Sequence, residues 1–127
     1  MPRRGLPLAR VRTEAGDVVC ERCEIADRLG PRMKGLLGRD GLEPGTGMLI
    51  DREPSVHTFF MRFPIDVVFL NRERKIVKIA HALRPWRVAG AVNAAAALEL
   101  PAGAAAAAGI GEGDLLVVEG LGDAENS

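Results

Sequence analysis

The chain is poor in aromatic residues: its 127 residues include four phenylalanines, one tryptophan and no tyrosine. A nucleic-acid surface that stacks bases on aromatic rings is therefore not expected. The formal net charge is zero, so the chain also lacks the excess of positive charge on which binding to duplex phosphates rests. No apolar run approaches the roughly 20 residues that a membrane-spanning helix needs. We therefore expect neither nucleic acid nor a membrane as a partner.

Cysteine is scarce as well, with only Cys20 and Cys23 in a Cys-x-x-Cys spacing. Redox motifs and halves of zinc sites use this spacing, but no second pair completes a zinc site. The motif falls in an expected strand rather than at a helix N-terminus, where a thiolate would be stabilised. Because residues three apart in a strand point to opposite faces, we expect one buried and one exposed thiol.

Patterns for a metal or a cofactor are missing too. The two histidines, His57 and His81, have no ligand spacing such as His-Glu-x-x-His, so each is interpreted as a hydrogen-bonded core residue. Gly45-Thr46-Gly47 is too short for a phosphate loop. Gly111-Glu112-Gly113 precedes a strand, which is the wrong context for a dinucleotide fingerprint. We expect no metal and no cofactor.

Length and composition favour one globular domain, since 47% of the residues are hydrophobic and 27% are charged. The first residues are basic but have no apolar core after them, which does not fit a secretory signal. The sequence predicts a cytoplasmic protein with reduced thiols. It also predicts a flexible arm over residues 1–7, a single domain over 8–119 and a flexible tail over 120–127.

Short apolar runs separated by turn residues predict a mainly-β fold. Ala15-Gly16-Asp17 marks a hairpin, and Gly30-Pro31 opens a helix that Gly38 closes. A second short helix fits Gly103–Ala108. Strands are expected at residues 8–13, 18–25, 48–50, 57–61, 67–70, 75–82, 96–100 and 115–119. We predict a compact β-sandwich or distorted barrel of about eight short strands with one or two short helices.

The run from His57 to Leu70 holds all four phenylalanines, and it places a histidine, an arginine and an aspartate in the most apolar part of the chain. A charge in such a place needs a partner, because its desolvation is costly. Asp66 opens a strand expected to be buried on both faces. Its carboxylate either accepts backbone N–H bonds or pairs with an arginine, or it is a general base or ligand anchor of raised pKa.

Charge is unevenly distributed along the chain. The segment from Arg72 to Arg87 is basic, no Lys or Arg follows it, and the last stretch is acidic. Either the two parts neutralise each other or the basic segment binds an anion or an acidic partner. Trp86 lies between Arg84 and Arg87, which suits stacking on a sugar or an anionic ring if it is exposed. The alternative is a tryptophan that fills the rim of the core.

Several motifs occur in an order that resembles a known family. Residues 32–39 resemble Arg-x-x-Gly-Leu-Met-x-Arg, and Gly45–Ile50 resembles x-x-Gly-Met-Leu-Phe. Residues 59–69 resemble Phe-Trp-Met-Lys followed by Pro-Leu-Asp-Ile-Ile-Phe, and Leu98–Gly103 with Gly113-Asp114 resembles the closing motifs. From Ala26 to Val118 the chain resembles the family catalogued as domain of unknown function 192.

The resemblance implies a small, mainly-β bacterial or archaeal domain, and it brings no established activity. Two departures from the family pattern bear on any ligand. The turn between Met61 and Asp66 is several residues shorter and lacks the common Asn-Thr, and Phe60 stands where a tryptophan is usual.

Three functional hypotheses follow. The first is a non-catalytic accessory domain that binds a small polar saccharide or an anionic metabolite. The second is an enzyme with Asp66 and His57 as an acid–base pair, its catalytic residues being otherwise unknown. The third is a structural or interaction module that recruits a protein through Arg84 and Arg87. The candidate ligand-binding residues, expected to line one cleft, are Arg39, His57, Phe60, Asp66, Trp86 and Glu99.

Overall fold

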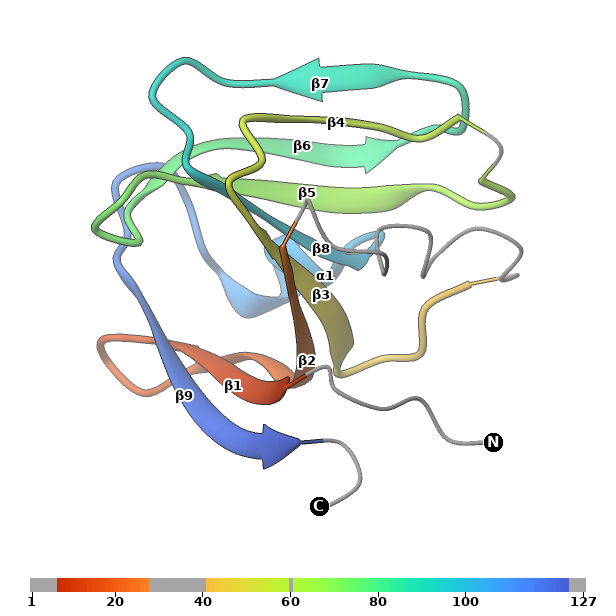
Figure 1. Ribbon diagram of the computed structural model, residues 1–127. Helices are drawn as coiled ribbons and strands as arrows, with labels where there is room; N and C mark the ends of the chain where they lie inside the picture. Colours follow the sequence, from red (N-terminus) through yellow and green to blue (C-terminus); the bar gives the residue numbers. More distant parts are fainter. Residues whose placement is uncertain (1–6, 28–40, 60, 124–127) are drawn as a thin grey trace.

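Most of the chain forms β-strands, as the sequence predicts. The structure, a computed structural model, describes residues 7–27, 41–59 and 61–123 (Figure 1). Within these ranges it has nine strands and one short helix. Seven strands form a sheet of order β6-β5-β8-β3-β2-β1-β9, and two form a second sheet, β4-β7. The elements are β1 (Pro7–Thr13), β2 (Val18–Asp27), β3 (Thr46–Asp51), β4 (Ser55–His57), β5 (Ile65–Leu70), β6 (Ile76–Leu83), β7 (Val88–Gly90), β8 (Ala96–Pro101), α1 (Ala104–Ala108) and β9 (Leu116–Asp123).

The seven-stranded sheet curls until its two outer strands meet at one end. Lys75 and Leu115 form an isolated antiparallel bridge just before β6 and β9 begin. The N–H of Leu116 donates to the Arg74 carbonyl at 2.9 Å, and the N–H of Ile76 donates to the Asp114 carbonyl at 2.8 Å. β6 and β9 pair nowhere else in the described ranges, so the sheet is rolled without forming a closed barrel.

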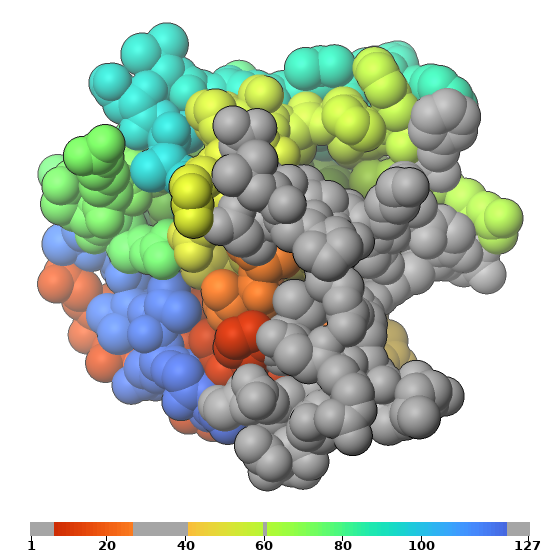
Figure 2. All heavy atoms as spheres, viewed as in Figure 1, coloured from red at the N-terminus to blue at the C-terminus, as the bar shows by residue number. Residues whose placement is uncertain are grey.

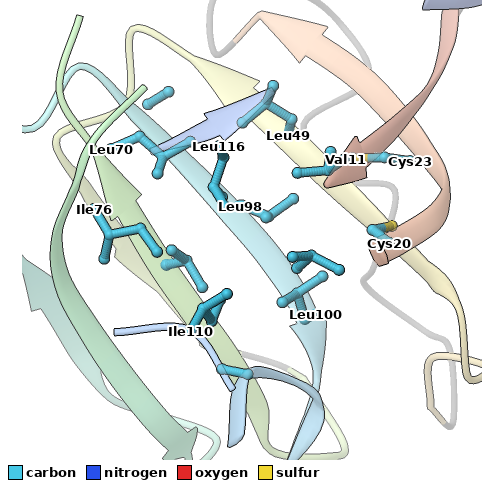
Figure 3. Close-up of a cluster of buried hydrophobic side chains, with 14 residues drawn as sticks. Val11, Cys20, Cys23, Leu49, Leu70, Ile76, Leu98, Leu100, Ile110 and Leu116 are labelled. Atoms are coloured by element: carbon cyan, nitrogen blue, oxygen red, sulfur yellow. The ribbon is translucent and has the colours of Figure 1, made fainter. Parts of the chain in front are cut away.

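The main hydrophobic core fills the inside of this roll (Figure 3). Its side chains come from strands far apart in the sequence, including Val11, Leu49, Leu98 and Leu116. Ala105 of α1 joins them. Burial of this apolar surface is the main stabilising contribution to the fold.

β5 is buried on both of its faces, and all six of its residues are below 1% exposed. Val68 and Leu70 face the inside of the roll. Val67 and Phe69 face outwards, into a second apolar cluster beneath the β4-β7 sheet. The absence of polar alternation in this run predicted such double burial, which the structure confirms.

The predicted hairpin, the strands 48–50, 67–70 and 96–100, and the short helix over residues 103–108 are confirmed. Two boundaries are wrong. β4 ends at His57 and does not reach Met61, because Thr58 leaves the strand to bind the turn before β7. β9 continues through Asp123 and so extends beyond its expected end at residue 119, because its pairing with β1 extends to Pro7.

β7 was missed, since its three residues are too short to show a period. The predicted helix between residues 29 and 38 lies outside the described residues. α1 has five residues, and no helix in the described ranges is long and apolar enough to cross a membrane.

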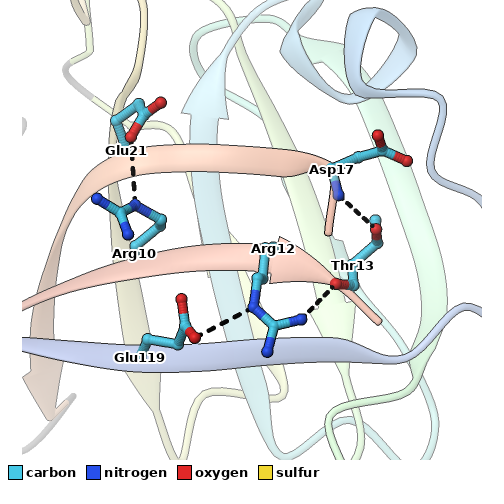
Figure 4. A network of polar contacts seen from close by, with 6 residues as sticks. All are labelled: Arg10, Arg12, Thr13, Asp17, Glu21 and Glu119. Atoms are coloured by element: carbon cyan, nitrogen blue, oxygen red, sulfur yellow. Dashed lines mark hydrogen bonds and ion pairs between the residues drawn. The ribbon is translucent and has the colours of Figure 1, made fainter. Parts of the chain in front are cut away.

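Within the described residues, the ion pairs that the acidic C-terminal stretch and the basic segment make are with other parts of the chain. Glu119 on β9 meets Arg12 on β1 at 3.2 Å, and Arg10 meets Glu21 on β2 at 3.3 Å (Figure 4). In the basic segment, Arg74 instead meets Asp51 at 3.3 Å. These pairs are partly exposed, so each contributes little to stability.

Candidate functional site

Asp66 serves as a structural acceptor, which is the first of the two roles considered for it. Its side chain is fully buried, and both carboxylate oxygens accept backbone N–H bonds. Oδ1 accepts from Ala82 at 2.8 Å, and Oδ2 accepts from Gly103 at 3.1 Å and from Ala105 at 3.0 Å. The carboxylate thus joins β5 to a bulge in β6 and to the first turn of α1, and solvent does not reach it.

Glu99 lies on the opposite face of the sheet from Asp66. Asp66 pairs with Leu100 and Val67 pairs with Glu99, so the two acids occupy adjacent register positions whose side chains alternate. Glu99 is 7% exposed. Burial raises the pKa of the Glu99 carboxyl to about 7, and the negative charge of Glu53 adds to the shift. The expectation that Asp66 and Glu99 line one cleft is therefore wrong.

The raised pKa of Glu99 predicts a loss of stability as pH rises. The carboxyl holds its proton more tightly in the folded chain than in the unfolded one, where the pKa is near 4.5. The free energy of unfolding should therefore contain a contribution that is full below pH 4.5 and is lost as pH rises through about 7. That loss is about 3 kcal/mol.

Urea unfolding of Glu99→Gln at a series of pH values checks this expectation. The variant should lack this component and should gain stability relative to the unmodified chain above pH 7. Glu112→Gln, on an exposed turn, is the matched control and should keep the original pH profile. Identical profiles for Glu99→Gln and the unmodified chain would contradict the assignment.

His57 is exposed at the end of β4 and does not belong to the core, so that interpretation is wrong. Its ring stacks on Phe59 with a centroid distance of 4.7 Å, and Phe59 stacks on Trp86 at 5.7 Å. We call this row of three rings the aromatic platform.

His81 is exposed as well, again contrary to its interpretation as a core residue. The reason is the bulge in β6 beside Asp66. Two steps along β5, from Ile65 to Val67, oppose three steps along β6, from Ala80 to Leu83, which shifts the alternation of β6 at this point. Ala82 within the bulge has a φ of 48°.

A dense set of hydrogen bonds fixes the turn that carries Trp86. Trp86 adopts a left-handed backbone with a φ of 65°, which is costly for a bulky residue. Buried Thr58 offsets this conformational cost by forming hydrogen bonds to the turn. Its carbonyl accepts from the N–H of Trp86 at 3.0 Å, and its hydroxyl accepts from the N–H of Arg87 at 2.9 Å and donates to the Arg84 carbonyl.

The platform is open to solvent. Trp86 is 55% exposed, so it does not fill the rim of the core. Arg84 and Arg87, at the two ends of the same turn, are exposed as well. Figure 2 shows the surface of β4 and β7 along the upper side of the molecule. The arrangement presents aromatic faces and two guanidinium groups on a backbone that is already ordered.

The sequence reasoning missed Thr58, the residue that holds the platform together. A threonine inside an apolar run is a weak signal, because threonine also suits a strand. The other two candidates, Arg39 and Phe60, lie outside the described residues. Of the four candidates within the described ranges, His57 and Trp86 are brought together, through Phe59.

Two hollows lie away from the platform. One, of about 370 Å³, is polar and is lined by Asp51, Arg52, Asn71, Arg72, Arg74 and Ala95. The other, of about 510 Å³, is mainly apolar, and its lining includes Val19, Glu21, Gly45 and residues of α1. Among the described residues, no group of three or more His, Cys, Asp or Glu side chains could hold a metal ion.

Solved structures share this fold. A crystal structure from Sinorhizobium meliloti, described as a "putative transcription regulator", superposes with a TM-score of 0.78 at 25% identity and covers 93% of this chain and 97% of that one. A protein of unknown function from Novosphingobium aromaticivorans superposes with a TM-score of 0.73 at 28% identity, covering 87% and 83%.

Two archaeal proteins are similar in sequence. A UPF0127 protein of Thermococcus sibiricus is 36% identical over 76 residues, which are 57% of this chain and 49% of the relative. A UPF0127 protein of Pyrococcus abyssi is 35% identical over 71 residues, which are 51% and 57%. The matched region thus spans about half the length of these relatives. Residues 10–118 match the model of domain of unknown function 192 (DUF192, "Uncharacterized ACR"), so the chain belongs to this family.

Proposed function

We propose that this chain is a non-catalytic binding domain whose aromatic platform takes a small saccharide that carries an anionic group. The single observation that carries the proposal is the stack of His57, Phe59 and Trp86 on a strained, fully hydrogen-bonded turn. Strain of this kind persists only where the surroundings impose it, and it concentrates at functional sites.

The chemistry of the surface supports this ligand class. A sugar ring presents C–H groups that pack on an aromatic face, while its hydroxyl and acidic groups stay in water. Trp86 offers such a face at 55% exposure. Arg84 and Arg87 flank it and can bind a carboxylate or a sulfate. Because Thr58 already fixes the turn, binding would not have to order it.

An enzyme built on Asp66 and His57 has less support. Asp66 is fully buried, and its two oxygens already accept three backbone N–H bonds. His57 is exposed at the end of β4, in a different sheet. A carboxylate in that setting has no route to a substrate that His57 contacts.

Intrinsic fluorescence tests the proposal directly, because Trp86 is the only tryptophan and there is no tyrosine. Titration with uronic-acid oligosaccharides should change the Trp86 emission in a saturable way, and neutral oligosaccharides of the same length should bind more weakly. Phe59→Ala should weaken binding roughly tenfold, through the loss of about 1.4 kcal/mol of stacking support.

Two further variants test whether binding depends on the arginine charges and on the position of the platform. Arg84→Gln with Arg87→Gln should remove the preference for the acidic sugars but keep the neutral affinity. Val92→Ala, at an 86% exposed position that lies outside the platform, is the matched control and should bind normally. An unchanged Trp86 emission across the whole panel, together with no saturation transfer to its indole protons, would overturn the proposal.

A protein partner is the second candidate, and a separate observation favours it. Trp86, Val88 and Val92 are 55%, 65% and 86% exposed within seven residues of sequence. Clustered exposed apolar side chains often mark a protein interface. If a protein binds here, a partner captured from native lysate should be lost in the Val88→Ser variant. It should also be lost in a variant in which the charges of Arg84 and Arg87 are reversed. Capture that survives both changes would count against it.

The description of the Sinorhizobium meliloti structure as a "putative transcription regulator" suggests nucleic acid as a third kind of partner. We do not extend it to this chain. Duplex binding rests on the neutralisation of many phosphates, and the formal net charge here is zero.

A further inference from the structure

Both cysteines belong to the main core, although they lie three positions apart along β2. The expectation of one buried and one exposed thiol is wrong, since Cys20 is 1% exposed and Cys23 is fully buried. A bulge explains the difference. Ala9 pairs with Cys23 and Val11 pairs with Cys20, so two steps along β1 oppose three steps along β2. The extra residue turns the second thiol to the same face as the first.

Each thiol donates to a backbone carbonyl, Cys20 to Gly45 at 3.6 Å and Cys23 to Glu24 at 3.7 Å. The interaction of the two thiol side chains with each other lowers the pKa of Cys20 and raises that of Cys23. Both thiols are free, so neither is tied up in a disulfide. The two thiols therefore differ: Cys20 ionises first, and Cys23 retains its proton.

The apolar hollow reaches close to Cys20. Val19 and Glu21, the chain neighbours of Cys20, line it, and so does Gly45. The Gly45 carbonyl oxygen lies 3.6 Å from the Cys20 sulfur. A volume of about 510 Å³ exceeds by far the ~30 Å³ that a water molecule occupies. A molecule the size of hydrogen peroxide can therefore come within one backbone group of Cys20.

We propose that Cys20 and Cys23 form a redox dithiol, which a small hydroperoxide arriving through this hollow oxidises to an intramolecular disulfide. In the first step the Cys20 thiolate attacks one peroxide oxygen and the O–O bond breaks, which gives a Cys20 sulfenic acid and hydroxide. The hydroxide takes up the proton that the Cys20 thiol released on ionising and becomes the first water. In the second step the Cys23 sulfur attacks the Cys20 sulfur. Hydroxide leaves and takes the Cys23 proton, giving the disulfide and a second water.

In the overall reaction, two thiols and one hydrogen peroxide give one disulfide and two waters. Cys20 is the peroxide-reacting residue because its thiol donates to the carbonyl of Gly45, which lines the hollow, and because its pKa is lowered. Cys23 resolves the sulfenic acid because its side chain belongs to the same core cluster as that of Cys20 and the two thiols interact. This dithiol uses no part of the aromatic platform.

Intact mass spectrometry of the unmodified chain tests the proposal without any substitution. The protein is treated with hydrogen peroxide, denatured and then alkylated with N-ethylmaleimide. We expect a monomer that is lighter by two hydrogens, carries no alkyl group, and regains two alkylation sites after dithiothreitol. Two alkylatable thiols after a treatment that fully oxidises free cysteine in the same buffer would overturn the proposal.

Two variants test the order of the steps. In Cys23→Ser the sulfenic acid should persist on Cys20, where dimedone traps it. In Cys20→Ser, the matched control, Cys23 should give no dimedone adduct. An adduct on Cys23 but none on Cys20 would refute the assignment. Circular dichroism confirms folding of each variant, and the measurement on the unmodified chain stands if either fails to fold.

Discussion

Replacing Asp66 by alanine should lower the free energy of unfolding by about 4 kcal/mol, because three buried backbone N–H groups lose their acceptor at once. Ala82 belongs to β6, while Gly103 and Ala105 belong to the start of α1, and Asp66 is fully buried. The loss therefore combines unsatisfied donors with the release of α1 and of the β6 bulge. Urea unfolding followed by circular dichroism measures it.

Asp66→Asn refines the test, since it keeps the size of the side chain. Its NH₂ group would face a backbone N–H in place of an acceptor oxygen, so this change should also destabilise the chain. Asp17→Asn, in the exposed turn between β1 and β2, is the control and should stay within about 0.5 kcal/mol of the unmodified chain. A stable Asp66→Asn would mean that the carboxylate is not the main link between these elements.

Gly47→Ala should be the next most damaging change, with an expected loss of about 3 kcal/mol. A Cβ at this position would lie 2.6 Å from the Glu99 carbonyl oxygen and 3.1 Å from both the Cys20 sulfur and a Leu100 methyl group. The nearest of these atoms belongs to the backbone of β8, which cannot give way without breaking its pairing with β3. A thermal unfolding scan should show a much lower midpoint.

Gly120→Ala is the matched control for this position. Gly120 is also a strand glycine, in β9, and nothing lies within 4 Å of a Cβ built on it. The substitution should leave stability unchanged or raise it slightly, because alanine restricts the unfolded chain. Equal midpoints for the Gly47 and Gly120 variants would show that β3 and β8 can separate more easily than their contact suggests.

The contacts of Gly47 and Asp66 explain why the separate motifs that resemble the family occur together in this chain. Gly47 belongs to the Gly45–Ile50 motif, Asp66 to the motif over residues 59–69, and Gly103 to the Leu98–Gly103 motif. In the structure Gly47 lies against the backbone of Glu99, and Asp66 binds the N–H of Gly103. These described motif residues meet at one junction of β3, β5, β8 and α1, and there they specify the fold.

The family motifs include only part of the solvent-exposed platform and its flanking arginines. Phe59 falls within a motif, while His57, Arg84, Trp86 and Arg87 fall outside the motifs. A binding surface built from such positions can differ between relatives that share the scaffold. We therefore expect the fold to be common to the family and the proposed ligand of the platform to be particular to this chain.

The sequence alone determined the features that depend on local pattern. The mainly-β class, the first hairpin, the double burial of β5 and the short helix α1 all follow from apolar runs, turn residues and glycines within a few positions of one another. The exposure of Trp86 between two arginines was one of two alternatives that the same pattern left open.

Only the tertiary structure decided how side chains face one another across strands. One extra residue in β2 brings Cys20 and Cys23 to the same side, and one extra residue in β6 exposes His81. Asp66 and Glu99 are separated because adjacent positions on paired strands face opposite ways. The physical reason is that strand alternation is strict, so a single bulge reverses every face that follows it. Pairing with a distant strand places that bulge, and local sequence does not.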